Sequence, residues 1–256
     1  MTFKHIISRD NSLFKQLKRL ADSSRERRKL GETLLDGAHL VETYLEVFGE
    51  PELLIIPEGE STAEVTHLTQ QLANIPTVMF PTLMFQELAP VASPTGILAL
   101  VKTPTIAPPE ALNFVLMLED IQDPGNLGSM LRTAAAAGVD AVYLSEGCTE
   151  AWSPKALRGG QGAQFVLPIV ERADLVAFAA EFKGQVLATT LQGDSIYQVD
   201  MTKPTAIAIG NEGNGLSVAM QKAASHQVTI PIAGVESLNA AAAASICLFE
   251  RVRQTL

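Results

Sequence analysis

The chain has 256 residues, 47% of them hydrophobic and 18% charged, a composition that excludes disordered and collagen-like proteins. At roughly 100 to 200 residues per domain, this length predicts two domains. The formal net charge of −9 argues against a protein that binds nucleic acid over its whole surface. The two cysteines, Cys148 and Cys247, form no CxxC pair, so we expect buried free thiols, a reducing compartment and no metal site.

Neither a membrane span nor a signal peptide is predicted. The longest nearly apolar stretch covers residues 240–249, about half of the ~20 residues that a membrane helix requires. The N-terminal sequence MTFKHIISRD lacks the apolar core of a signal peptide. We therefore expect a soluble, cytoplasmic protein.

Charge is distributed unevenly along the chain. Residues 1–31 hold nine Lys and Arg against three acids, whereas the remaining residues hold ten against 25. After Asn11, a suitable N-cap, apolar residues recur at helical spacing with the bases on the other face, which predicts a basic helix pair over residues 11–29. We expect this pair to contact a polyanion; a solvated helix pair without a partner is the alternative. The candidate contacts are Lys15, Lys18, Arg19, Arg25, Arg27, Arg28 and Lys29.

A small α/β unit follows. Apolar runs predict strands within residues 32–37, 52–58, 76–80 and 96–102, and helical patterns cover residues 39–48 and 63–72. The segment TPTIAPPE, residues 103–110, carries three prolines and cannot continue a helix or a central strand. We therefore expect domains at residues 1–104 and 111–256, joined by a linker at 105–110.

Beyond the linker, continuous apolar runs alternate with helical patterns. The predicted strands are FVLMLED (114–120), AVYLS (141–145), FVLPIV (165–170), QVLATT (185–190), TAIAI (205–209) and VTIPI (228–232). Helices are expected through the alanines at 134–137, over 173–182, after Leu216 and from about Leu238. This alternation predicts a mostly parallel sheet covered by helices on both faces. Ligands of such sheets bind beyond the carboxyl ends of the strands.

Three loops at those strand ends carry unusual residues. In the first, DPGNLGS (123–129), Asn126 is a candidate N-cap, and Arg132 can lean back over Gly128 toward the strand-end crevice. A surface salt bridge is the alternative for Arg132. The second loop, GNEGNGLS (210–217), fits neither a dinucleotide fingerprint nor a P-loop. Glu212 lies in this loop, and the alternative to a functional role is that its negative charge is favourable near a helix N-terminus.

The third loop, AGVES (233–237), leads into a helix with five consecutive alanines, 240–244. High helix propensity alone could explain the alanines. Ser237 is a candidate helix cap. Ser237 and Asn239 are polar at the mouth of an otherwise apolar helix, which packing does not explain.

Together the three loops resemble the signature motifs of the SpoU/TrmH class of SPOUT RNA 2′-O-methyltransferases. The resemblance covers the whole region after the linker and rests on residues 119–147, 206–217 and 228–250, with SPKALRGGQGAQFVLP (153–168) between them. Upstream, ETLLDGAHLVETYL and SPTGILAL are similar to the family's N-terminal substrate domain, although Asp36 and Thr95 stand where Glu and Gln are usual. The tripeptide GGQ (159–161) also occurs in peptide release factors, but here it lies within the family pattern.

The resemblance implies a C-terminal α/β domain with a deep trefoil knot, preceded by a small α/β RNA-binding domain of ribosomal-protein type. It also implies S-adenosyl-L-methionine as cofactor, structured RNA as substrate and a homodimer, with no metal, DNA or membrane partner. Ribosomal RNA of the large subunit, 23S, is favoured over transfer RNA. The implied catalytic residues are Arg132, Asn126, Glu212, Ser237 and Asn239. The implied cofactor contacts are Thr190, Leu191, Ile209, Gly210, Gly215, Ile230 and Leu238.

An ordinary guanidinium stays protonated, so we interpret Arg132 as a phosphate ligand and alkoxide stabiliser, with Asn126 orienting it and Glu212 holding the arginine or the loop. Two other functions stay open. An RNA-binding or assembly factor of the same fold would have lost catalysis, and the five polar residues together disfavour it. A nucleotide-dependent α/β enzyme would use the glycine loops for phosphates, but neither a Walker lysine nor GxGxxG is present.

Overall fold

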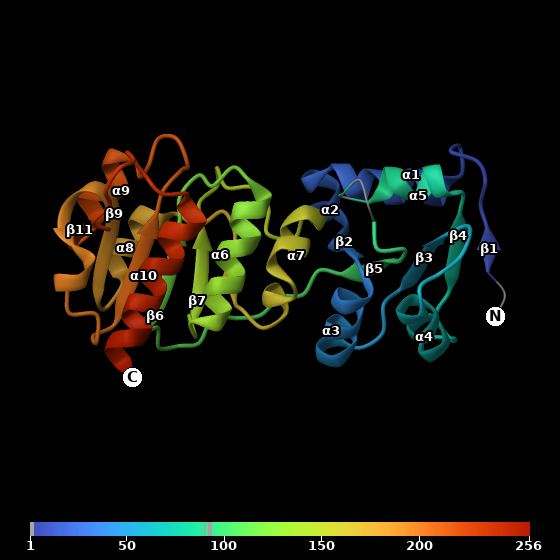
Figure 1. Ribbon diagram of the computed structural model, residues 1–256, viewed down its shortest axis with the longest axis horizontal. Helices are drawn as coiled ribbons and strands as arrows, with labels where there is room; N and C mark the ends of the chain where they lie inside the picture. Colours follow the sequence, from blue (N-terminus) through green and yellow to red (C-terminus); the bar gives the residue numbers. More distant parts are fainter. Residues whose placement is uncertain (1–2, 90, 92–93) are drawn as a thin grey trace. The chain divides into compact units, whose positions relative to one another are not determined.

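The computed structural model describes residues 3–89, 91 and 94–256, and the chain divides into two compact units (Figure 1). The first unit contains residues 1–104 and 152–165, and the second contains residues 105–151 and 166–256. The break after Pro104 lies in the proline-rich segment, where residues 103–109 form neither helix nor strand. The observed division differs from the expected one at residues 152–165. These residues pack with the first unit, although we expected them in the second domain.

The first unit is built on a mixed five-stranded sheet. In spatial order its strands are β1 (Lys4–His5), β4 (Thr77–Phe80), β3 (Leu53–Pro57), β5 (Leu98–Lys102) and β2 (Glu32–Asp36). β1, β4 and β3 run parallel to one another, and β5 is antiparallel to both of its neighbours. All four strands predicted from the apolar runs are present.

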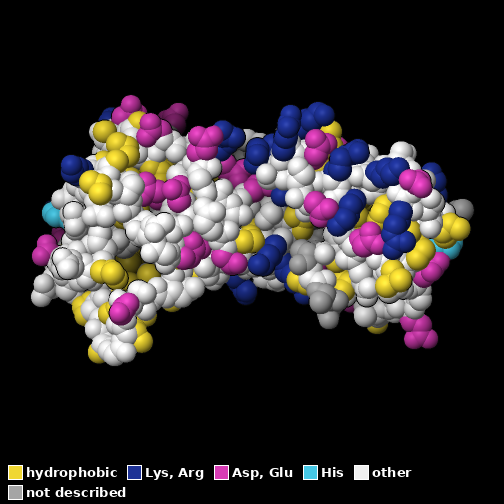
Figure 2. Space-filling model, turned by 90° about the horizontal axis from the view of Figure 1, so that it is seen from above, with side chains coloured by type: hydrophobic (Ala, Val, Ile, Leu, Met, Phe, Trp, Pro, Cys, Tyr) yellow, Lys and Arg dark blue, Asp and Glu magenta, His cyan; other side chains and the backbone are white. Residues whose placement is uncertain are grey.

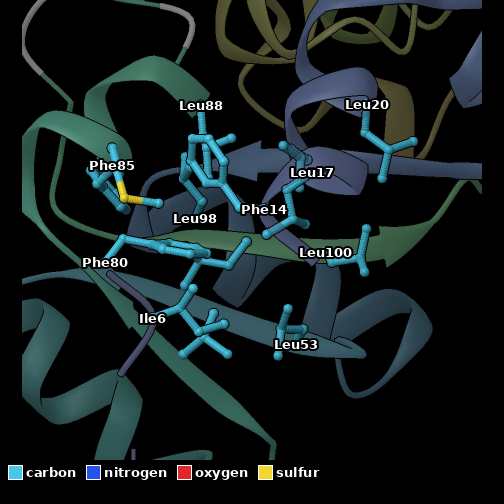
Figure 3. Packing of buried hydrophobic residues seen from close by; sticks show 14 residues of the cluster. Ile6, Phe14, Leu17, Leu20, Leu53, Phe80, Phe85, Leu88, Leu98 and Leu100 are labelled. Carbon is cyan, nitrogen blue, oxygen red and sulfur yellow. The ribbon is translucent and has the colours of Figure 1, made fainter. Parts of the chain in front are cut away.

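Helices cover both faces of this sheet. α1 (Ser12–Asp22) and α5 (Thr82–Leu88) pack on one face, where Phe14, Leu17 and Leu20 meet sheet residues such as Phe80 (Figure 3). α3 (Ala38–Phe48) and α4 (Ala63–Gln71) lie on the other face (Figure 1). The short α2 (Ser24–Leu30) follows α1. Asn11 caps α1 as predicted, since its side chain accepts a hydrogen bond from the backbone N–H of Leu13.

An inserted segment completes the first unit beside β2. It contains α7 (Pro154–Gly160) and the short 3-10 helix η1 (Ala163–Phe165), neither of which the sequence analysis predicts. The hydroxyl of Thr33 on β2 donates to the carbonyl of Trp152 at 2.7 Å, and the Phe165 ring packs edge-on against Tyr44 of α3. The GGQ tripeptide ends α7: Gln161 adopts the left-handed conformation that closes the helix, with φ of 50°.

The second unit is built on a six-stranded sheet in which all strands run parallel, where the sequence predicted a mostly parallel sheet. Its spatial order is β11 (His226–Thr229), β9 (Gln185–Ser195), β10 (Thr205–Ile209), β6 (Phe114–Leu118), β7 (Ala141–Leu144) and β8 (Ile169–Val170). Several strands end earlier or begin later than expected; β6, for example, ends at Leu118 rather than at Asp120. β8 keeps only the end of FVLPIV because Phe165 belongs to η1, and β11 ends at Thr229, before Pro231.

Helices cover both faces of the second sheet. α8 (Leu175–Glu181) and α9 (Val218–Ala223) bury Leu175, Ala179 and Met220 against β6, β9 and β10. α6 (Pro124–Ala136) and α10 (Ala240–Thr255) lie side by side on the other face (Figure 1). Gly138, with φ of 73°, lies two residues after the end of α6. Within the described ranges, no helix is long and apolar enough to cross a membrane.

Both cysteines are free thiols in the second unit, as expected. Cys247 is fully buried on α10, and burial raises its pKa to about 12. Cys148 is partly buried, and burial likewise raises its pKa, although hydrogen bonds from the backbone of Ile121 and from Ser145 act against this rise. Neither environment favours a reactive thiolate.

Candidate active site

Two of the three loops singled out in the sequence are joined directly by hydrogen bonds beyond the carboxyl ends of β6 and β10. The Glu119 carboxylate accepts from the backbone N–H of Ser217 at 2.7 Å and from its hydroxyl at 2.8 Å. The Asn211 side chain donates to the carbonyl of Asp120 at 2.8 Å. The sequence analysis misses these four residues as site residues, although Glu119 and Asp120 directly follow an apolar strand, where polar groups gather in such sheets.

Glu212 connects the second loop to the start of α6. Its carboxylate accepts hydrogen bonds from the Asn126 side chain at 3.1 Å and from the backbone N–H groups of Gln122 and Asp123, both at 3.2 Å. Burial acts to raise the pKa of Glu212, but these hydrogen bonds outweigh it and hold the pKa below its usual value. Glu212 is therefore ionised at neutral pH.

Asn239 adds the third loop to this arrangement. Its side-chain nitrogen donates to the amide oxygen of Asn126 at 3.1 Å. Its own amide oxygen accepts from the backbone N–H groups of Ala241 and Ala242, at 2.9 and 3.2 Å, and so caps α10. Three segments that are distant in sequence thus meet in one hydrogen-bonded chain, which we call the Glu212–Asn126–Asn239 chain.

The two helix caps differ from those predicted. Asp123, not Asn126, caps α6, since its carboxylate accepts from the backbone N–H of Asn126 at 2.8 Å. The signal for this cap is Pro124, because proline is favoured at the first position of a helix. Asn239, not Ser237, caps α10, and Ser237 lies exposed in the preceding loop.

A pocket of about 680 Å³ lies beside Glu212. Its wall is formed by residues 189–192, 209–216, 229–230, 232 and 235–238 together with parts of α9, α10 and β11, and the surface of the second unit is hollowed at these loops (Figure 2). Glu212 and Ser237 both line it, from different loops. All seven residues predicted to contact a cofactor lie on this wall: Thr190, Leu191, Ile209, Gly210, Gly215, Ile230 and Leu238.

A bulge in β9 supplies one side of the pocket. β11 pairs Gln227 with Ala188 but the next residue, Val228, with Asp194, so residues 189–193 leave the regular ladder. Gly193 fits here because a Cβ at this position would meet the backbone of Gln227. The freed residues Thr189, Thr190, Leu191 and Gln192 face the pocket.

The second loop is a tight turn that excludes side chains at Gly210. A Cβ at Gly210 would overlap the backbone of Gly215 and Leu216. Asn211 pairs with Gly215 through backbone hydrogen bonds of 3.1 and 2.9 Å, and its side-chain oxygen accepts from the N–H of Gly213 at 2.9 Å. The turn can therefore close this tightly only with glycine at position 210.

Arg132 does not join the Glu212–Asn126–Asn239 chain. It lies exposed on α6 and makes no hydrogen bond or ion pair with any residue in the described part of the chain. Asn126, which we expect to orient Arg132, instead contacts Glu212 and Asn239. The next residue, Thr133, contacts Ser245 of α10 with 3.3 Å between the hydroxyls, so α6 and α10 are also joined here. The role assigned to Arg132 stays a prediction.

Residues 113–249, more than half of the chain, match the model of the SpoU rRNA Methylase family. The chain belongs to the SpoU rRNA methylase family. A 23S rRNA (guanosine(2553)-2′-O)-methyltransferase of Bacillus subtilis is 34% identical to it, over 96% of this chain and 98% of that protein.

Solved structures of the family resemble both units or only part of the chain. The SpoU methyltransferase AviRb from Streptomyces viridochromogenes, in complex with the cofactor AdoMet, is 27% identical with a TM-score of 0.81, and covers 95% of this chain and 98% of that chain. A TrmH/SpoU tRNA modifying enzyme from A. aeolicus is 28% identical with a TM-score of 0.52, but covers only 56% of this chain and 76% of that chain.

The basic residues of the N-terminal helices that are predicted to contact RNA differ in their exposure to solvent. Arg27 is only 5% exposed, and its guanidinium donates to the carbonyls of Leu20 and Ala21, so the prediction that it contacts RNA is wrong. The short α2 gives too few turns for hydrophobic periodicity to reveal this buried position. The other predicted bases fall into a paired set and an unpaired set.

Three of the remaining bases have intramolecular acidic neighbours: Lys15 bonds Asp10 at 2.8 Å, Lys18 lies 3.0 Å from Asp22, and Arg19 lies 3.8 Å from Glu26. Arg25, Arg28 and Lys29 are exposed and make no hydrogen bond or ion pair with the residues that the structure describes. Lys and Arg side chains gather on the face over α1 and α2 (Figure 2). Among described residues, no group of three or more His, Cys, Asp or Glu could hold a metal ion.

Proposed function

We propose that this protein transfers a methyl group from S-adenosylmethionine to a ribose 2′-hydroxyl in structured RNA, with 23S ribosomal RNA as the substrate. The Glu212–Asn126–Asn239 chain beside the pocket carries this proposal, because it unites the three family motifs at one place. The B. subtilis relative that acts on 23S rRNA and the AdoMet complex of AviRb support the substrate and the cofactor.

The pocket fits this cofactor. Its volume of about 680 Å³ lies within the ~300–1,000 Å³ typical of small-molecule sites. Its wall combines apolar side chains such as Ile209 and Leu238 with residues of the turn that begins at Gly210. Thr190, Leu191, Ile209, Gly210, Gly215, Ile230 and Leu238 would hold the cofactor. When bound, its sulfonium centre supplies the methyl group.

The protein's own residues position the reaction and stabilise its charge. In-line transfer needs two reactants held close and aligned, and a weakly acidic hydroxyl proton must leave. Glu212 holds the second loop against the start of α6, and Asn126 and Asn239 hold α6 and α10 in register. Arg132 would bind the adjacent phosphate and stabilise the developing alkoxide, because a guanidinium is almost always protonated. Ser237 would orient the substrate at the pocket mouth.

The first unit supports ribosomal over transfer RNA as substrate. The tRNA-modifying relative covers about half of this chain, whereas the 23S rRNA relative covers nearly all of it. We assign RNA binding to the first unit, as a small α/β module of ribosomal-protein type, with exposed Arg25, Arg28 and Lys29 among its phosphate contacts. Mapping 2′-O-methyl marks in RNA from cells with and without the protein tests the substrate. A lost mark in transfer RNA alone would reject the ribosomal assignment.

The finer architecture follows from the same proposal. We assign a deep trefoil knot to the second unit, supported by the path of the chain: β11 pairs outside β9, after which α10 returns to lie beside α6. We also assign a homodimer whose site draws on both copies, supported by the exposed Phe249 of α10, which a second copy would cover. Sedimentation velocity tests the dimer. The cytoplasmic location stays a prediction.

Two variants test the role of Arg132. We expect Arg132→Ala to lose methylation of the true substrate while binding S-adenosylmethionine normally in calorimetry, and Arg132→Lys to restore little activity because lysine lacks the planar fork. Near-native methylation by both variants would remove Arg132 from the mechanism. Failure of the native protein to bind the cofactor would instead favour the non-catalytic RNA-binding factor.

A further inference from the structure

A further loop reaches the candidate active site from the strand next to β6. It covers residues 145–149 after β7, and we call it the fourth loop, because it is not one of the three loops that the sequence singles out. β7 pairs with β6 in parallel, so the fourth loop starts at the same edge of the sheet as the first loop. The backbone N–H of Ser145 donates to the carbonyl of Leu118 at 2.9 Å. The fourth loop therefore lies against the end of β6.

Asp120 is bonded to the fourth loop in an unusual backbone conformation. Its φ of 55° lies in the left-handed region, which residues other than glycine, asparagine and aspartate rarely adopt. Its backbone N–H donates to the Ser145 hydroxyl oxygen at 2.9 Å, and that hydroxyl donates to the Asp120 carboxylate at 2.7 Å. Gly147 leaves room for the carboxylate, because a Cβ there would overlap it. The fourth loop thus holds both the backbone and the side chain of Asp120.

The carbonyl of Asp120 holds the turn that lines the pocket. It accepts a hydrogen bond from the Asn211 side-chain nitrogen at 2.8 Å. The Asn211 side-chain oxygen accepts from the backbone N–H groups of Gly213 and Asn214, both at 2.9 Å. Asn211, Gly213 and Asn214 all line the pocket. The conformation of the Asp120 backbone sets the direction of its carbonyl, so a path of hydrogen bonds runs from Ser145 through Asp120 to the pocket wall.

Gln122 adds a second connection to the fourth loop. Its side-chain nitrogen donates to the carbonyl of Gly147 at 2.7 Å and to that of Asp120 at 3.1 Å. Its backbone N–H donates to the Glu212 carboxylate at 3.2 Å. The segment from Asp120 to Gln122 is therefore fixed by the fourth loop on one side and holds two residues of the second loop on the other.

We propose that Asp120 and Ser145 are positioning residues for the cofactor, which hold the turn at residues 211–215 in the arrangement that binds S-adenosylmethionine. The dissociation constant of a ligand rises by the inverse of the fraction of molecules in the competent arrangement. Releasing Asn211 from the Asp120 carbonyl lowers this fraction and therefore weakens binding. This inference rests on the proposed function, in that it requires the pocket to bind S-adenosylmethionine.

Calorimetric titration of the full-length protein with S-adenosylmethionine tests the role of Asp120. Alanine tolerates the left-handed conformation poorly and cannot bond to Ser145. We expect Asp120→Ala to raise the dissociation constant at least about 10-fold, the effect of lowering the competent fraction to about a tenth. Asp120→Asn should stay within about 3-fold of the native value, because asparagine adopts this conformation and its amide oxygen can accept from Ser145. A rise as large for Asp120→Asn as for Asp120→Ala would overturn the assignment.

Asp140 provides the matched control for a merely structural role. Its carboxylate accepts from the backbone N–H groups of Asn113 and Phe114, at 2.6 and 2.8 Å, at the opposite end of β6. Asp140→Ala should lower the thermal stability, as Asp120→Ala does, but leave the dissociation constant unchanged. Equal rises in the dissociation constant for the two variants would show that general destabilisation is the cause, and would overturn the inference.

A double-mutant cycle tests the path from Ser145 to the pocket. Among the described residues, Ser145 and Asn211 each bond to Asp120 but not to each other. We expect Ser145→Ala and Asn211→Ala each to raise the dissociation constant, and the double variant to raise it by less than the product of the two effects, because both act on the same carbonyl. Effects that multiply would overturn the path, and this cycle decides even if Asp120→Ala unfolds.

The native protein separates failure of this inference from failure of the proposed function. If the native protein does not bind S-adenosylmethionine, the proposed function is rejected and the inference with it. If the native protein binds the cofactor and the Asp120 and Ser145 variants bind it equally well, only the inference is rejected.

Discussion

The side chain of Asn239 donates a 3.1 Å hydrogen bond to the amide oxygen of Asn126, 113 positions earlier in the chain. Asn126 in turn donates to Glu212 at 3.1 Å, so each amide has its nitrogen and its oxygen committed to different partners. The orientation of Asn126 therefore depends on an acceptor on one side and a donor on the other. Replacing one member leaves the next without a partner.

Asn126→Asp breaks this chain at its centre. It replaces a donor to Glu212 by a second carboxylate, which removes a charge-assisted hydrogen bond of about 1.5–3 kcal/mol and adds repulsion. We expect kcat/KM for RNA methylation to fall by at least about 10-fold, since 1.4 kcal/mol is a factor of ten. Gln198→Glu adds the same charge at an exposed position of the second unit and should be neutral. Equal activities of the two variants would contradict a role for the chain.

Glu212 makes stability depend on acid. Burial acts to raise its pKa, but hydrogen bonds from Asn126, Gln122 and Asp123 outweigh burial and hold the pKa below its usual value. A depressed folded pKa contributes stability that is present above the unfolded pKa and is lost as pH falls through the folded pKa. We expect the difference in unfolding free energy between native protein and Glu212→Gln to be constant near neutral pH and to shrink below pH 4.5. Denaturant titrations at several pH values measure this difference, and a difference that grows on acidification would refute the assignment.

Gly210→Ala should weaken cofactor binding. The added methyl group would overlap the backbone of Gly215 and Leu216, and overpacking of this kind costs about 1–3 kcal/mol. We therefore expect the dissociation constant for S-adenosylmethionine in calorimetry to rise about 5- to 150-fold. Gly213→Ala, in the same turn, places its methyl 3.6 Å from the Asn211 side chain, an ordinary contact, and should bind normally. Equal affinities would show that the turn opens freely.

Arg158→Ala should destabilise the first unit. It leaves the fully buried Asp36 carboxylate without its cation, a change that costs about 3–5 kcal/mol. Adding Asp36→Asn removes the uncompensated charge and should restore part of the loss. Arg25→Ala, at an exposed position without a partner in the described residues, should change unfolding free energy by no more than about 0.5 kcal/mol. Urea denaturation compares the three variants, and a loss for Arg158→Ala as small as for Arg25→Ala would contradict the buried pair.

Local patterns in the sequence were enough to predict the parallel sheet and the meeting of the three loops. Continuous apolar runs such as FVLML mark strands buried on both faces, and parallel strands end at one edge of a sheet. The resemblance to the family implied Asn126, Glu212 and Asn239 as site residues, and the structure brings these three together. Whether they act in catalysis is a matter for the variants above.

The features that sequence patterns missed depend on distant partners. Thr33 and Trp152 are 119 positions apart, so no local signal announces that α7 packs beside β2. Arg27 looks like its basic neighbours in sequence, but its guanidinium donates to the carbonyls of Leu20 and Ala21, which helps to make its burial favourable. The bulge in β9 likewise depends on its register with β11.

The insertion of residues 152–165 into the first unit has a consequence for biosynthesis. A nascent chain emerges N-terminus first, and domains generally fold as units as they appear. Here the first 104 residues cannot cover the edge of β2, or pair Asp36 with Arg158, until residues 152–165 have left the ribosome. By then β6 and β7 of the second unit have already been synthesised. The two units are therefore synthesised interleaved, and no single cut in the chain separates them intact.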